Sequence, residues 1–459
     1  MRGNNSPNHL KDKKYVEMLF VDSLGRTHDI EVSPGRFIES LTAGKVIDGS
    51  SIGMTPIESS DLVLMPIEGM GFEAPWDPEA YVALCDIMQG DSKLEPFELN
   101  DRHILGGMVG KAREMGFEAR AANEHEYFVM DVRPQDAARE MVGINKEARV
   151  GKMGRWESLT EDQAFYMCTS PIDVFRKLRL RIYNSLPLVR AEGEYAHHEV
   201  GSGGQQEITF KYKDPLGLAD TTVLFKHLAK NLAAEEGRTH TFMPKPVVGI
   251  NGSGTHYHFS LVDKDGNNLF YGDKQGNMSE LSLHFIGGIL EHFKGLTLGV
   301  APTENSRKRL LAGYEAPINR AWGHKNRSAL VRIPSYSTES AARIEFREPD
   351  NTGNPYKTLA FILAAGLDGI ERGIDPGEPY LKNTYLHPDE FKDYSVPQTQ
   401  DEAIKEFRKD TLFRDVMGRK AFDTYVELVE KRFVKYGDEN PKWDAKNITG
   451  FEYKNYLMI

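Results

Sequence analysis

Acidic, histidine and arginine residues gather on short segments of the chain that have the composition of β-strands. The segments are Glu124-His-Glu126, His198-Glu199, Gln206-Glu207, Thr255-His256 and Arg343-Ile-Glu345-Phe-Arg347. Successive side chains of a strand point to opposite faces, so Glu124 and Glu126 share one face. By the same rule His256, His258 and Ser260 share a face. Several of these strands therefore pair an ionisable face with an apolar one.

Five carboxylates lie on such faces. They are Glu124, Glu126, Glu199, Glu207 and Glu345. If they converged without a cation, they would repel one another and take up protons. Carboxylate ligands with one imidazole, here His256, suit Mg²⁺ or Mn²⁺ better than Zn²⁺, which favours cysteine and histidine. Arginines beside such a site indicate a phosphate group, and the whole set predicts an enzyme that uses ATP. A single Glu-x-Glu pair would predict only a solvated strand face.

The composition limits the class of protein. With 459 residues the chain is long enough for two or three domains, and 40% apolar and 27% charged residues are ordinary for a globular protein. A net charge of -11 argues against a general nucleic-acid binder. Two cysteines, Cys85 and Cys168, exclude a disulfide scaffold and favour a reducing cytoplasm. No run approaches the roughly 20 apolar residues that cross a bilayer.

The elements that must position these residues fall into two parts. Residues 15–98 have strand patterns at Tyr15–Val21, Thr27–Val32, Leu62–Met65 and Tyr81–Ile87. A helix is predicted from a cap at Asn100 or Asp101 to about Met115. Later helical patterns cover Ile172–Leu188, Leu218–Glu236, Leu281–Leu296, Pro355–Arg372 and Gln400–Phe433, with loops at 299–306 and 380–398. We expect a disordered lead-in at 1–14, without the apolar core of a signal peptide, a small mostly-β domain at 15–98 and a larger α+β catalytic domain at 99–459.

The order of the polar motifs resembles that of type I glutamine synthetases, from about residue 15 to the C-terminus. The matching segments are Asp48-Gly-Ser-Ser-Ile, Glu124-His-Glu126, His197-His-Glu199-Val, Gln206-Glu207-Ile, Phe242-Met-Pro-Lys-Pro, Asn251-Gly-Ser-Gly-Thr-His256, Asn305-Ser-Arg-Lys-Arg309, Gly313-Tyr-Glu315-Ala-Pro, Asn326-Arg-Ser-Ala and Arg343-Ile-Glu345-Phe-Arg347. Any one of these segments could occur by chance, but the full series in this order is highly specific.

The resemblance implies a role for each group. One Mg²⁺ or Mn²⁺ would be held by Glu126, Glu199 and Glu207, and a second, bridging ATP phosphates, by Glu124, His256 and Glu345. The amino-acid substrate would be bound by Asn251, Gly252 and Arg309, with Arg347 nearby. The nucleotide and the transferring phosphoryl group would be bound by His258, Ser260, Arg327, Arg332 and Arg343. The ammonium pocket would be formed by Asp48, Ser51, Tyr166, Glu199 and Glu315.

The chemistry of such a ligase agrees with these groups. A carboxylate does not react with ammonia until ATP converts it to an acyl phosphate, and metal ions and arginines stabilise the charge on the transferring phosphoryl group. Ammonium must lose a proton before it attacks, and Asp48 is the expected base. Glu315, on a flap, would keep water away from the acyl phosphate.

The family also implies a fold and an assembly. The expected fold class is α+β, with a small β-grasp-like N-terminal domain and a catalytic domain whose antiparallel half-barrel sheet is flanked by helices. The expected assembly is a dodecamer of two hexameric rings in which the Asp48 loop completes a neighbouring site. We expect the C-terminal segment from Tyr453 to pack against another subunit.

Three alternatives stay open. A γ-glutamyl-amine ligase would use methylamine or a polyamine in place of ammonia, and the loop at Met54, one residue shorter than usual, together with the extra acids Glu304 and Glu339, leaves room for that activity. A guanidino kinase would not need paired glutamate-rich metal sites. A regulatory relative without activity would be expected to lack metal ligands or the flap glutamate. Tyr385, which matches a position adenylylated in some bacterial members, is expected to be an ordinary surface-loop tyrosine.

Overall fold

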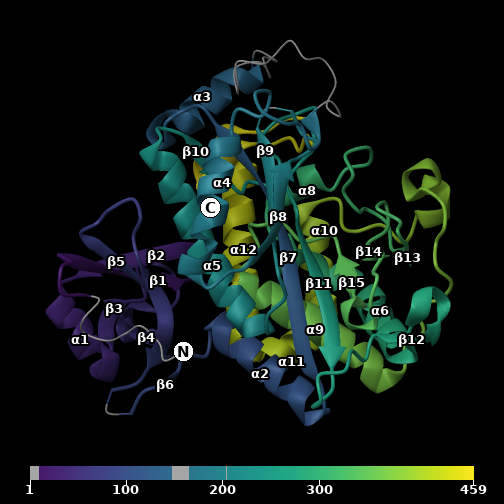
Figure 1. The fold of residues 1–459 in the computed structure, drawn as a ribbon, viewed down its shortest axis with the longest axis horizontal. Helices are drawn as coiled ribbons and strands as arrows, with labels where there is room; N and C mark the ends of the chain where they lie inside the picture. Colours follow the sequence, from purple (N-terminus) through teal and green to yellow (C-terminus); the bar gives the residue numbers. More distant parts are fainter. Residues whose placement is uncertain (1–9, 92, 147–164, 203) are drawn as a thin grey trace.

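The computed structural model describes residues 10–91, 93–146, 165–202 and 204–459, and Figure 1 shows a small N-terminal unit beside a larger one. Most of the predicted lead-in lies outside the described residues. The predicted boundary at residues 98–99 falls between strand β6 (Glu95–Pro96) and helix α2 (Asp101–Glu114). Among the described residues, no helix is long and apolar enough to cross a membrane.

The N-terminal unit is a mixed sheet with the β-grasp arrangement. Its strands are β1 (Tyr15–Val21), β2 (Thr27–Val32), β3 (Lys45–Asp48), β4 (Asp61–Glu73), β5 (Ala80–Gln89) and β6. The order is β2-β1-β5-β4-β3, with β6 on β5, and only the β1–β5 pair is parallel. Helix α1 (Pro34–Ala43) begins at the Ser33 cap and buries Phe37. The four predicted strands all lie within this sheet.

The larger unit is built on a curled sheet of eight strands that forms a half-barrel. Its strands are β7 (Glu118–Met130), β8 (Gly193–His198), β9 (Gln205–Phe210), β10 (Thr239–Thr241), β11 (Thr255–Val262), β13 (Trp322–His324), β14 (Val331–Ile333) and β15 (Ile344–Phe346). The order is β13-β14-β15-β11-β7-β9-β8, with β10 on β7, and only β13–β14 is parallel. The short strand β12 (Tyr271–Lys274) lies outside this order. The expected α+β fold class is confirmed.

Helices flank the half-barrel sheet (Figure 1). They are α2, α3 (Pro134–Lys146), α4 (Arg176–Ser185), α5 (Pro215–Glu235), α6 (Glu280–Glu291), α7 (Phe293–Val300), α8 (Glu304–Arg309), α9 (Pro355–Arg372), α10 (Gln400–Lys409), α11 (Thr411–Met417), α12 (Arg419–Glu439) and α13 (Gly450–Tyr456). Helix α9 packs against α2, α5 and α6, and most of its residues are buried. Asn100 caps α2 as predicted, and the predicted bounds of α9 are confirmed.

Two long helical patterns are interrupted, and one predicted loop is partly helical. The pattern at Gln400–Phe433 contains three helices, because Asp410 caps α11 and Gly418, with φ 75°, precedes α12. The pattern at Leu281–Leu296 breaks at His292, between α6 and α7. The predicted loop at 299–306 includes the start of α8, whose Thr303 and Ser306 form a reciprocal capping box. Capping side chains and a glycine, not the apolar period, decide the boundaries at Thr303, Asp410 and Gly418.

The C-terminal segment packs partly into its own chain, but three of its seven residues are exposed, so its packing against another subunit stays a prediction. Tyr453, Tyr456 and Leu457 are each 1% exposed. Glu452 pairs with Lys308 at 2.5 Å, and both side chains are fully buried. The segment supports helix α8 from behind.

A histidine between two aspartates gives a pH-dependent contribution to stability. His292 contacts Asp410 at 2.8 Å through Nδ1 and Asp368 at 2.9 Å through Nε2. Burial opposes its charge, but the two aspartates outweigh burial and raise the pKa of His292. This contribution is complete below the ordinary histidine pKa and is lost as pH rises through the raised value. We expect His292→Gln to lower stability by about 1–2 kcal/mol at pH 6 and by less at pH 9.

Thermal unfolding of the variant and of the wild type at both pH values measures this difference. The same substitution at His284 in α6 controls for loss of an imidazole. Equal destabilisation of His292→Gln at pH 6 and pH 9 would contradict the charge-based explanation.

Candidate active site

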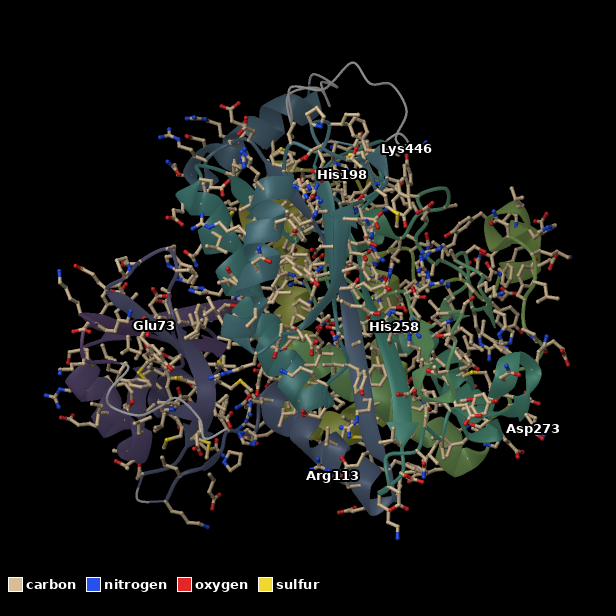
Figure 2. The ribbon with its side chains drawn as sticks, in the orientation of Figure 1. Glu73, Arg113, His198, His258, Asp273 and Lys446 are labelled. Atoms are coloured by element: carbon tan, nitrogen blue, oxygen red, sulfur yellow. The ribbon has the colours of Figure 1, made fainter. Side chains whose placement is uncertain are left out.

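A cavity of about 680 Å³ opens on the concave side of the half-barrel sheet. Figure 2 shows His258, one of its residues, on β11 in the middle of the molecule. Most of the predicted site residues line this cavity. They are Glu124, Glu126, Tyr166, Glu199, Glu207, Asn251, Gly252, His256, His258, Arg309, Glu315, Arg327, Arg332, Arg343 and Arg347. The fold thus brings residues from β7, β8, β9, β11 and several loops to one place.

The first cluster of possible metal ligands joins three neighbouring strands. Glu124, His256 and Glu345 each offer a ligand atom, and these atoms lie within 4.8 Å of one another. The register explains the convergence, because His256 lies opposite Glu124 and His258 lies opposite Glu345. His256 Nδ1 lies 3.0 Å from Glu124 and 3.5 Å from Glu345, and His258 Nε2 lies 2.9 Å from Glu124. Glu124, His256 and Glu345 are the predicted ligands of the metal ion that bridges the ATP phosphates.

The second cluster differs in one member from the predicted set of Glu126, Glu199 and Glu207. The ligand atoms that lie within 4.8 Å of one another belong to His197, Glu199 and Glu207. Glu126 lies directly opposite Glu207 on β9, and its carboxylate accepts a 2.7 Å hydrogen bond from the backbone of Gly254. His256 Nε2 lies 3.7 Å from Glu126, so this residue stands between the two clusters.

Burial and neighbouring charges shift the pKa values of these carboxylates. Burial raises the pKa of Glu126 and Glu207, and burial together with repulsion from Glu207 raises the pKa of Glu199 to about 8. Burial also disfavours the Glu345 carboxylate, but the charge of Arg347 lowers its pKa to about 2. A hard divalent cation would stabilise the ionised forms, and oxygen donors with an imidazole are a suitable set for Mg²⁺ or Mn²⁺.

Four of the five arginines that line the cavity donate hydrogen bonds to acceptors of the chain. Arg332 and Arg347 each bond to Glu345 at 2.5 Å. Arg343 donates to His258 at 3.3 Å, and Arg309 donates to the backbone carbonyl of Glu348 at 2.6 Å. Fixed guanidinium groups beside a metal cluster form a site for an anion such as a phosphate.

Glu315 and Tyr166 lie at the exposed side of the cavity. Tyr166 is 39% exposed, and Glu315 is exposed with φ 58°, a left-handed conformation that is unusual for a glutamate. The carbonyl of Glu315 lies 3.5 Å from the Arg347 guanidinium. A strained residue at the mouth of a cavity is typical of a segment with a functional role.

Four predicted site residues do not line the cavity. Glu345 is fully buried behind it, in contact with His256 and with two arginines of the cavity. Ser260 lies one alternation farther along β11 than His258 and does not reach the cavity. Asp48 and Ser51 belong to the N-terminal unit, where Asp48 ends β3 (Figure 1).

Asp48 is exposed and accepts three hydrogen bonds from its own loop. Its carboxylate accepts from the Ser50 backbone at 2.8 Å and from the hydroxyls of Ser50 and Ser51 at 2.6 and 2.5 Å. The Ser50 and Ser51 hydroxyls lower the pKa of Asp48 to about 2. Within one chain the structure does not bring Asp48 to the cavity.

The sequence analysis assigned no role to several residues that line the cavity. Among them are Tyr195, His197, Gln205 and Tyr314. Tyr195 and His197 lie two residues apart on β8, and their stacked rings have centroids 5.8 Å apart. The period-two pattern that identified Glu124 and Glu126 could therefore have found them. Gln205 bonds to the Gly252 carbonyl at 2.9 Å, a long-range contact for which the sequence holds no signal.

The departures from the family pattern lie away from the cavity. Glu304 is fully buried against Tyr456 and Arg432, and Glu339 is exposed but does not line the cavity, so the expectation that they add acids to the site is wrong. Met54 is 3% exposed, inside the N-terminal unit. Tyr385 is half-buried, and its hydroxyl donates to the Ala316 carbonyl at 2.9 Å, so it is not an ordinary surface tyrosine.

Comparison with known proteins identifies relatives over nearly the whole chain. Residues 12–90 match the model of the glutamine synthetase β-grasp domain, and residues 98–448 match that of the glutamine synthetase catalytic domain. The chain is 36% identical over 465 residues to the glutamine synthetase of Pyrococcus abyssi, with 98% of each chain covered. It is 39% identical over 436 residues to that of Sulfolobus acidocaldarius, covering 90% of this chain and 91% of the relative.

Solved structures also resemble the chain. The structure titled "GmaS/ADP complex-Conformation 1" superposes with a TM-score of 0.82 at 26% identity, covering 99% of both chains. The structure titled "Apo GmaS without ligand" has a TM-score of 0.81 at 26% identity, covering 97% of both chains.

Proposed function

The chain belongs to the glutamine synthetase family and is a glutamate–ammonia ligase, and we propose that it forms glutamine through a γ-glutamyl phosphate. ATP would phosphorylate the γ-carboxylate of L-glutamate, and ammonia would then displace the phosphate. The observation that carries this proposal is the meeting of two groups of metal-ligating side chains and five arginines in one cavity. Phosphoryl transfer to a carboxylate needs this combination, because both partners are anionic.

Each of the two clusters of possible metal ligands would hold one ion. Glu124, His256 and Glu345 would hold one divalent ion, and Glu126, Glu199 and Glu207, with His197 beside them, would hold the other. Such ions, Mg²⁺ or Mn²⁺, would neutralise charge on the phosphates and orient the carboxylate that is phosphorylated. These assignments rest on the donor chemistry of the residues and on the family resemblance.

The arginines and the flap would act on the substrates directly. Arg327, Arg332 and Arg343 would bind the nucleotide and stabilise the transferring phosphoryl group, as fixed guanidinium groups do. The amino-acid portion of glutamate would be bound by Asn251, Gly252, Arg309 and Arg347. Tyr166, Glu199 and Glu315 would surround the ammonium ion, and Asp48, with Ser51 beside it, would remove its proton. Glu315 would also exclude water from the acyl phosphate.

Because Asp48 cannot reach the cavity of its own chain, the proposal includes an assembly. A second copy would place its Asp48 loop at the cavity mouth, in a homo-oligomer for which the dodecamer is the expected form. Exposed apolar side chains on both surfaces support this contact. Ile57 near the loop is 84% exposed, and Met167 beside the cavity is 56% exposed. With Cys85 and Cys168 both unpaired, the cytoplasm is the proposed location.

Phosphate release from ATP and glutamate with Mg²⁺ tests this proposal when ammonium, methylamine and a polyamine are compared and each product is identified by mass. We expect the fastest turnover with ammonium, and glutamine as its product. Preference for a substituted amine would instead make the chain a γ-glutamyl-amine ligase. ATP binding without turnover with any amine would support the regulatory relative.

A further inference from the structure

A buried lysine contacts two segments beside the cavity: the loop at Ile250–Gly252, called the substrate loop, and residues 313–316, called the flap. Lys245, in the Phe242-Met-Pro-Lys-Pro segment, is 3% exposed, and its Nζ lies 3.7 Å from the centroid of the Tyr314 ring. Tyr314 precedes Glu315 and lines the cavity. An ammonium over an aromatic face is attracted by the ring quadrupole, and the attraction grows when the pair is shielded from water. The Lys245 ammonium group therefore stabilises the position of the Tyr314 ring.

The same ammonium group also bonds to the substrate loop. Nζ of Lys245 donates to the carbonyl of Ile250, the residue before Asn251 and Gly252. The lysine backbone is fixed in turn by Asn305, whose side chain accepts from the Lys245 amide at 2.7 Å and donates to its carbonyl at 3.0 Å. One rigidly held cation thus contacts both the substrate loop and the flap residue next to Glu315.

The other end of the flap has a support of its own. The Tyr385 hydroxyl donates to the Ala316 carbonyl at 2.9 Å, immediately after Glu315. Burial raises the pKa of Tyr385 to about 12, so this hydroxyl remains a donor throughout the neutral range. Glu315, with φ 58°, holds a left-handed conformation between these two supports, and Gly313, with φ 92°, holds one just before them. A glutamate in that region is strained unless its surroundings impose the conformation.

We propose that Lys245 and Tyr385 hold the flap at residues 313–316 from its two ends, and that Lys245 also couples the flap to the loop at Ile250–Gly252. Both are positioning residues, since neither side chain lines the cavity. This inference rests on the proposed function for its catalytic consequence. A loosened flap admits water, whose oxygen attacks the acyl phosphate carbon; the carbon–oxygen bond to phosphate breaks, and glutamate and phosphate are released with the proton passing to solvent.

The test compares three variants of the full-length protein. Lys245→Met removes the charge at similar length, Tyr385→Phe removes only a hydroxyl, and Lys230→Met is the matched control. Lys230 also donates to a backbone carbonyl, that of Met458 at 3.2 Å, but it lies on α5 and does not line the cavity. The measurements are glutamine formed per ATP hydrolysed, KM for glutamate, and hydrogen exchange of the backbone amides at residues 311–318.

We expect Lys245→Met to speed exchange at residues 311–318 roughly tenfold and to release phosphate in excess of glutamine. It should also raise KM for glutamate, because it loosens Ile250. Tyr385→Phe should produce the same uncoupling with an unchanged KM, and Lys230→Met should match the wild type in all three measurements.

A wild-type ratio of glutamine to ATP in both Lys245→Met and Tyr385→Phe would overturn the proposal, as would unchanged exchange at the flap. If Lys245→Met fails to fold, Tyr314→Leu removes the same contact from the other side and should uncouple in its place. The exchange measurement needs no substrate. A wild-type protein that makes no amide product would therefore refute the proposed function while the positioning of the flap is still tested.

Discussion

Replacing Glu345 with glutamine is expected to lower the rate of glutamine formation roughly 10³-fold, the scale found when one electrostatic contact to a transition state is removed. Glu345 is fully buried, lies 3.5 Å from His256, and bonds to Arg332 and Arg347 at 2.5 Å. It is therefore both a proposed metal ligand and the acceptor that fixes two arginines. Glutamine keeps the shape of the side chain but loses the charge that serves both roles.

A matched control for this substitution lies three residues away. Glu348 is also fully buried, and it accepts a 2.6 Å hydrogen bond from Thr297. Burial raises the pKa of Glu348 to about 7, so its carboxyl is already partly neutral near physiological pH. Glu348→Gln should therefore leave the rate within about threefold of the wild type. Metal titration followed by thermal shift should show weaker Mg²⁺ or Mn²⁺ binding for Glu345→Gln alone.

Activity of Glu345→Gln close to that of the wild type would show that this carboxylate is not a ligand. Equal losses in both variants would point to a general effect of neutralising a buried acid. The comparison separates metal binding from stability because both glutamates are buried on the same segment.

The parts of the site that the sequence predicted are those governed by strand alternation. Glu124 and Glu126, or Arg343 and Glu345, must share a face wherever their strands lie, because side chains alternate along a strand. The spacing does not specify which strand pairs with which. The pairing of β9 with β8 places His197 opposite Glu207, and that neighbour was absent from the predicted ligand set. The pairing could be predicted only through the family resemblance.

Contacts between distant segments could not be predicted in the same way. The Tyr385 hydroxyl reaches Ala316 across 69 residues of sequence, and Glu304 is buried against Tyr456 across 152 residues. Each depends on how loops and helices pack after the sheet has formed. In contrast, the break at Gly418 has a local cause, since its φ of 75° favours glycine. Such local signals are present in the sequence but were outweighed there by the apolar pattern of the flanking helices.

Substituting Asp48 with asparagine is expected to reduce glutamine formation roughly 10²–10⁴-fold, the usual contribution of a positioned general base. The exposed carboxylate of Asp48 is fixed by Ser50 and Ser51, at 2.6 and 2.5 Å from their hydroxyls, and does not line the cavity of its own chain. Asparagine preserves the size of the side chain but cannot accept a proton. ADP formation with glutamate in the absence of ammonium should be less affected, because phosphorylation of glutamate does not need this base.

The control for Asp48→Asn is Asp61→Asn. Asp61 lies directly opposite Asp48 on β4 and is also exposed, so it tests whether any neutralised acid at this edge of the sheet has the same effect. Its activity should equal that of the wild type. Similar losses in the two variants would indicate a change in charge or assembly in place of a lost base.

Mixing two inactive variants tells whether Asp48 acts within its own chain or in a neighbouring one. Glu345→Gln subunits carry an intact Asp48 loop, and Asp48→Asn subunits carry an intact cavity. In a closed ring with each site shared between neighbours, random assembly of equal amounts gives one intact site in four, so roughly a quarter of the wild-type activity should return. If each chain used its own Asp48, every site would remain defective and the mixture would stay inactive. Recovery of activity would therefore establish a composite site. Such a site is needed if Asp48 takes part in the reaction, because β3 lies away from the half-barrel cavity within a single chain.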